Sequence, residues 1–139
     1  MMLLLLSITA SAQSIKEPVP RPRPETPEEL VSALGGSHAP DQLYAARELR
    51  RLTRMSLKET ASRDPIRSLE ARQFLAVFDN TLAPLCIELL TEPKLTRPCA
   101  DILSLLETDA ALPALKARLP ETARGTQRSI ERAIQTLEE

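Results

Sequence analysis

Aromatic residues are scarce in this sequence, which has one Tyr, two Phe and no Trp among 139 residues. Proteins that bind single-stranded nucleic acid commonly stack bases on aromatic side chains, so the composition argues against that class. The net charge of −1 also gives no global attraction for a nucleic-acid backbone. We therefore expect no nucleic-acid partner.

Val and Ile are also few, and no run of residues alternates convincingly between apolar and polar side chains. The apolar content is mostly Leu and Ala, which are strong helix formers. Strands half-buried in a sheet would show the missing alternation. The sequence therefore predicts an all-α fold without strands.

The first twelve residues, MMLLLLSITASA, contain no charge and end in the small-residue pattern Ala10-Ser11-Ala12. An apolar core before such a pattern favours a secretory signal peptide, although a positive n-region is missing and the segment is short. We expect cleavage near Ala12 and a periplasmic or secreted mature protein. The alternative is an apolar N-terminus that packs on the domain. The run is too short for a transmembrane span.

Prolines alternate with other residues between Pro18 and Pro24. This pattern forces an extended backbone and prevents helix formation, so residues 13–26 are expected to form a semi-rigid spacer. A proline-rich docking ligand for another protein is the alternative interpretation. The chain thus divides into a signal peptide (1–12), a linker (13–26) and a helical domain (27–139).

Capping and stop signals divide the helical domain into about seven helices joined by short loops. The motif Thr26-Pro27-Glu28-Glu29 is a capping box that opens the first helix, and Gly35-Gly36 ends it. Six further helices are expected, with approximate ranges 40–61, 65–78, 79–90, 96–107, 108–119 and 121–139.

Three segments repeat one pattern of a short apolar helix, a break at Gly or Pro, and a second helix: residues 30–52, 85–106 and 115–137. A helix pair of this size cannot bury its own apolar face and must stack on a neighbour. The stretches YAARELRRL (44–52) and ALPALKARL (111–119) resemble HEAT repeats of the bacterial type. The resemblance implies a short right-handed α-solenoid of antiparallel helix pairs that serves as a protein-binding scaffold, and it implies no chemistry.

Cys86 and Cys99 lie symmetrically about Glu92-Pro93. If this dipeptide is the bend of an antiparallel helix pair, the two side chains stand at the same level, as a disulfide requires. In an exported protein such a pair would normally oxidise. Without export, two small buried apolar residues are the favoured interpretation. No zinc site is expected, because two cysteines and one distant histidine do not provide four ligands.

The helix expected over residues 40–61 carries five basic residues on one face: Arg47, Arg50, Arg51, Arg54 and Lys58. This basic stripe lies opposite Ala45, Leu49 and Leu52 and therefore points away from the core. Like charges one turn apart repel, so something should offset them. Two explanations stay open, namely solvent together with the acids of residues 25–29, or an acidic partner such as a protein, an anionic glycan or a lipid head group.

His38 lies in the turn GGSHAP, and no nucleophile or orienting acid can be identified beside it. We therefore expect no enzyme activity, no cofactor and no metal. The function favoured by the sequence is a monomeric, non-enzymatic protein–protein interaction module in the cell envelope. The alternative is a structural or regulatory subunit that completes a larger envelope assembly.

Overall fold

The computed structural model describes residues 23–139, apart from the side chain of Glu121. The predicted signal peptide and most of the predicted linker lie outside these residues. The described part is all-helical and contains no strand, which confirms the predicted class. Its elements are α2 (Pro27–Leu34), α3 (Ala39–Glu59), α4 (Pro65–Leu89), α5 (Thr96–Leu105), η1 (Asp109–Ala111), α6 (Leu112–Arg118), η2 (Leu119–Glu121) and α7 (Arg124–Glu138).

The predicted start of α2 is confirmed in atomic detail. Glu29 N–H donates to Thr26 Oγ1 at 3.1 Å, and Thr26 N–H donates to Glu29 Oε1 at 3.2 Å, which completes the capping box. At the start of α4, Asp64 Oδ1 accepts from the Ile66 N–H at 3.0 Å. Local side-chain chemistry therefore determines where both helices begin.

The prediction of about seven helices was wrong, because the described residues contain six α-helices. The two helices expected over residues 65–78 and 79–90 form one continuous helix, α4. Thr81 does not cap a new helix, since its hydroxyl donates to the Val77 carbonyl at 2.8 Å within the same helix. Pro84 lies inside α4, yet both Pro84 and Asn80 are exposed. Water can therefore satisfy the Asn80 carbonyl that Pro84 leaves without a helical donor.

Packing explains why α4 continues through the expected break. Phe78, Leu82 and Cys86 follow one another at intervals of four residues, and at most 2% of each is exposed. This spacing keeps all three side chains on one side of the helix, facing the core. Burial of that uninterrupted row outweighs the local signals of Asp79-Asn80-Thr81.

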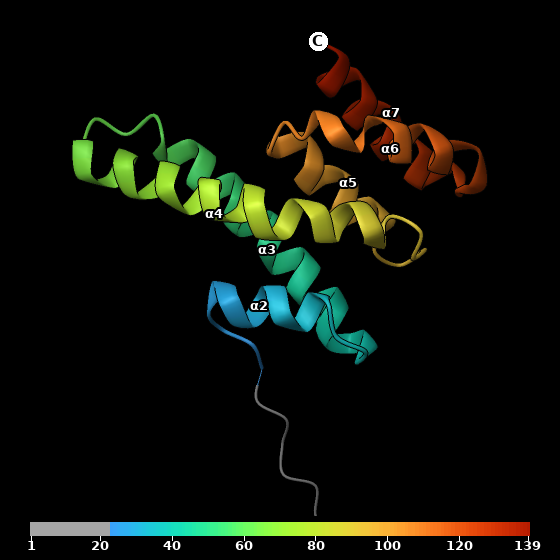
Figure 1. Cartoon of the computed structure of the whole chain (residues 1–139), viewed down its shortest axis with the longest axis horizontal. Coiled ribbons are helices and arrows are strands. Elements are labelled where there is room, and N and C mark those ends of the chain that lie inside the picture. The colour runs from blue at the N-terminus through green and yellow to red at the C-terminus, as the bar shows by residue number, and fades with distance from the viewer. Residues whose placement is uncertain (1–22) are drawn as a thin grey trace, which may run out of the picture.

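Three helices, α3, α4 and α5, pack against one another at the centre of the described residues. Helix α3 packs against α2, α4 and α5, helix α5 packs against α3, α4 and α7, and α6 packs against α7. Figure 1 shows α2 at the bottom and α7 at the top, with α3, α4 and α5 between them. Buried residues from all six α-helices belong to one connected apolar core. Within residues 23–139, no helix has both the length and the apolar content needed to cross a bilayer.

Candidate functional site

The residues of the basic stripe lie on the outer side of α3, as the sequence predicts. Arg47, Arg51, Arg54 and Lys58 are exposed, whereas Arg50 is partly buried. On the opposite side, Ala45 and Leu49 are fully buried. Four of the five residues are thus exposed on the outer side of α3, whereas Arg50 lies where α3 contacts α5.

Two arginines of the stripe already have carboxylate partners. Arg50 Nη1 lies 2.9 Å from Asp101 Oδ2 on α5, and Arg51 Nη2 lies 2.8 Å from Glu48 Oε1 on α3 itself. The hydrogen bond from Arg51 lowers the pKa of Glu48 and raises the pKa of Arg51. The acids of residues 25–29, which sequence reasoning offered as neutralising groups, form neither pair. Residues 47–58 are therefore only partly neutralised, and by other acids than expected.

A basic hollow of about 330 Å³ lies where α3 meets the start of α5. Its lining consists of Leu43, Arg47, Arg50, Lys94, Arg97 and Pro98. Sequence reasoning identified Arg47 and Arg50 but missed the two cations that come from the α4–α5 connection and the first turn of α5. The signal available was the pair of basic residues in EPKLTRP, yet only the packing of α3 on α5 shows that they face Arg47 and Arg50. Arg51, Arg54 and Lys58 do not line this hollow.

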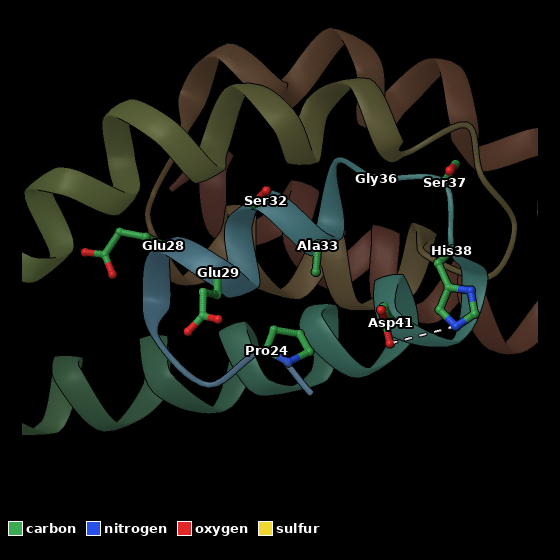
Figure 2. A pocket seen from close by; sticks show the side chains of 9 residues that line it. All are labelled: Pro24, Glu28, Glu29, Ser32, Ala33, Gly36, Ser37, His38 and Asp41. Atoms are coloured by element: carbon green, nitrogen blue, oxygen red, sulfur yellow. Dashed lines mark ion pairs between the residues drawn. The ribbon is translucent and has the colours of Figure 1, made fainter. Parts of the chain in front are cut away.

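A second hollow, of about 580 Å³, lies between α2 and the start of α3 and contains His38 (Figure 2). His38 Nε2 lies 4.0 Å from Asp41 Oδ1, one turn further along the chain. Figure 2 shows Glu28 and Glu29 at the other end of the hollow, and Glu29 is engaged in the capping box. The Ser37 side chain points away from the imidazole. The lining residues therefore do not form a hydrogen-bonded nucleophile–histidine pair.

Cys86 on α4 and Cys99 on α5 lie together in the core, as the sequence predicts. Both are free thiols with 0% exposure. A hydrogen bond between the two thiols, followed by burial, raises the pKa of Cys86 well above its usual range. The geometry suits two neutral thiols that contact one another, and their oxidation to a disulfide stays a prediction.

Helix α4 also carries an exposed apolar row that sequence reasoning missed. Ile66, Leu69 and Val77 are 68%, 55% and 57% exposed, respectively. At 100° per residue, the three positions lie within about 80° of one another, on the side of α4 opposite Phe78 and Leu82. The signal in the sequence was that apolar residues occur all round this helix, so it lacks a purely polar outer face.

Residues 23–139 contain no cluster of three or more His, Cys, Asp or Glu side chains that is arranged to hold a metal ion. Comparison with protein-family models, with curated proteins and with solved structures gives no match.

Proposed function

We propose that this chain is a non-enzymatic protein-interaction module of the cell envelope, and that a partner protein docks on the apolar row of α4. The observation that carries the proposal is the exposure of Ile66, Leu69 and Val77 on one side of one helix. Single exposed apolar residues are ordinary, but a row of large ones on one face is typical of an interaction surface.

The energetic argument rests on what a partner would cover. Full burial of a large aliphatic side chain stabilises by about 1.5–3 kcal/mol relative to its exposed state. Covering three side chains that are each more than half exposed is therefore worth several kcal/mol before the costs of association. The opposite side of α4 is already used by the core, so a second molecule is the natural cover for this row.

Charges around the row indicate the chemistry of the partner. Arg63, Arg67 and Arg72 are exposed and lie in or beside the first half of α4. Within the described residues they form no salt bridge, and Glu70 is the acid among them. A complementary surface would therefore carry an apolar strip with acidic residues on its rim. Arg54 and Lys58 of the basic stripe extend the positive charge along α3.

The proposed architecture is a short right-handed α-solenoid of HEAT-like pairs. The contacts between successive helices support this architecture, because α2 packs on α3, α4 packs on α5, and α6 packs on α7. The second members of these pairs also contact in succession, α3 with α5 and α5 with α7. Figure 1 shows α2 and α7 apart at the two ends, as a stack requires and a closed bundle does not. Handedness is taken from the resemblance to HEAT repeats.

Export is proposed on the sequence of residues 1–12, and the cysteine pair provides an independent chemical test of it. Intact-mass measurement of the protein from the envelope should place Gln13 first. The same spectrum should show a mass about 2 Da below that of the dithiol form, because an oxidising compartment joins contacting thiols. A dithiol chain that begins at Met1 would contradict export.

The experiment that tests docking is affinity capture from the envelope with the tagged mature chain. We expect a wild-type chain to retain a stoichiometric partner and the variant L69E/V77E to lose it, because two carboxylates then enter an apolar contact. The matched control is Q135E/T136E, which adds the same charge at exposed positions of α7. Equal capture by L69E/V77E and wild type would disprove docking on the row.

The alternative, a subunit that completes a larger envelope assembly, uses the same surface in a permanent way. It predicts that the purified chain self-associates or precipitates and becomes soluble as a monomer in L69E/V77E. The interaction module predicts a soluble monomer in both forms. Sedimentation of the two proteins over a range of concentrations separates these cases.

A further inference from the structure

We propose that the basic hollow between α3 and α5 is a binding site for a phosphate group carried on a small or lipid-linked molecule. The hollow is separate from the apolar row of α4, and the inference does not depend on the proposed protein partner. It rests on the four cations among its six lining residues, on their arrangement and on the lack of a carboxylate partner for three of them within the described residues.

The cations come from three segments that only the fold brings together. Arg47 and Arg50 stand one turn apart on α3, Lys94 belongs to the α4–α5 connection, and Arg97 lies in the first turn of α5. Arg50 is partly buried, while the other three are exposed around it. This arrangement surrounds the hollow with positive charge from several sides, unlike the linear stripe expected from the sequence.

Carboxylates offset little of this charge. Among the four cations, Arg50 has a carboxylate partner, because its Nη1 lies 2.9 Å from Asp101 Oδ2. Within residues 23–139, Arg47, Lys94 and Arg97 form no salt bridge and no side-chain hydrogen bond. Four cations around one small hollow repel one another, and a bound dianion would turn that repulsion into attraction.

The first turn of α5 adds a further preference for negative charge. Helix α5 has ten residues, and Arg97 and Pro98 are its second and third. The N-terminus of a helix carries a partial positive charge, which favours anions placed beside it. The helix terminus acts in the same direction as the side chains, but its contribution is small, because the Thr96 N–H already donates to the Glu92 carbonyl and Pro98 has no N–H.

Size and shape favour a phosphate group over a long acidic peptide. A volume of about 330 Å³ is at the small end of ligand pockets. Arginine presents a planar fork of N–H donors that matches two phosphate oxygens, and three arginines line the hollow. Leu43 and Pro98 provide an apolar edge for the carbon atoms of an ester.

Isothermal titration and thermal unfolding with inorganic phosphate, at constant ionic strength against chloride, test the site. We expect saturable binding of one phosphate, weakened about tenfold in R47Q and in R97Q. These side chains are exposed and unpaired within the described residues, so the variants should fold like the wild type. The matched control R54Q/K58Q removes two charges from the same helix outside the hollow and should change the affinity less than about twofold.

A second variant acts in the opposite direction. D101N removes the carboxylate on Arg50 and leaves the four cations in place, so it should bind phosphate more tightly by about twofold to tenfold. A weaker affinity in D101N would overturn the proposal. So would equal weakening in R47Q, R97Q and R54Q/K58Q, because binding would then follow net charge and not the hollow.

Vesicles distinguish the two sources of the phosphate group. Binding to phosphatidic-acid vesicles, lost in R47Q and R97Q, would assign the site to a lipid phosphate, and binding of free phosphate alone would assign it to a soluble ester. Either result supports the site. Binding to phosphatidylserine vesicles of the same charge that equals binding to phosphatidic-acid vesicles would overturn the site. The absence of saturable binding to both free phosphate and phosphatidic-acid vesicles would also overturn it.

Discussion

Arg50 on α3 and Asp101 on α5 form an ion pair with an Nη1–Oδ2 distance of 2.9 Å, although they are 51 positions apart in the sequence. About a quarter of each side chain is exposed. This ion pair joins α3 to α5, which are the second helices of two successive proposed helix pairs. It also partly neutralises the positive charge at one edge of the basic hollow.

This pair should contribute modestly to stability. In a double-mutant cycle with R50A and D101A, we expect a coupling free energy of about 1 kcal/mol or less, because solvent screens partly exposed charges. Urea unfolding at low and at high salt measures it, and the coupling should shrink at high salt. A coupling that is unchanged by salt would show that the contact acts through packing.

Pro84 offers a direct test of the single long helix. If α4 is continuous, P84A restores an N–H donor for the Asn80 carbonyl and should raise the free energy of unfolding by about 1–3 kcal/mol. If a new helix began with Thr81 as its N-cap, Pro84 would be its third residue and lie in the first turn, where the donor is not needed and the change would have little effect. Urea denaturation of P84A, with exposed Q73A as a control in the same helix, separates the two structures.

Among the non-glycine residues that the structure describes, Glu107 alone has a positive φ, at 55°. It ends α5 in a Schellman motif, in which Thr108 N–H donates to the Leu103 carbonyl and Glu107 N–H to the Ser104 carbonyl. Glycine adopts this conformation without strain, so E107G should stabilise the protein by about 1 kcal/mol. E107A keeps the Cβ and should give no such gain in thermal or urea unfolding.

The contacting thiols should make the reduced protein sensitive to alkaline pH. Because the pKa of Cys86 is raised in the folded state, its contribution to stability is fully present below the unfolded-state pKa. Stability should then fall as pH rises above about 8.5, where the unfolded chain loses the thiol proton and the folded chain keeps it. Urea unfolding across this range measures the loss.

The control for this prediction is C86A, whose stability should fall less steeply above that pH. The oxidised protein should also lose the dependence, because a disulfide has no thiol proton. A reduced wild type with constant stability through the alkaline range would contradict the buried thiol contact.

The ends of most helices could be predicted because they depend on neighbours in the chain. The capping box of Thr26 and Glu29 and the cap at Asp64 involve residues two or three positions apart, so their hydrogen bonds need no contact with a distant segment. At residues 79–81 the local signals did not start a new helix, because α4 continues through them. There, a turn signal competed with a buried row of apolar side chains whose partners lie on other helices.

By itself, the sequence determined an all-helical chain, the starts of α2 and α4, the outward direction of the basic stripe and the meeting of Cys86 with Cys99. These features follow from capping, helical periodicity and a short bend. Only the tertiary structure decided that α4 is one helix, that Asp101 neutralises Arg50, and that Lys94 and Arg97 join Arg47 around one hollow. Such contacts depend on how α3, α4 and α5 pack, and helical periodicity specifies which face of a helix is buried but not which helix covers it.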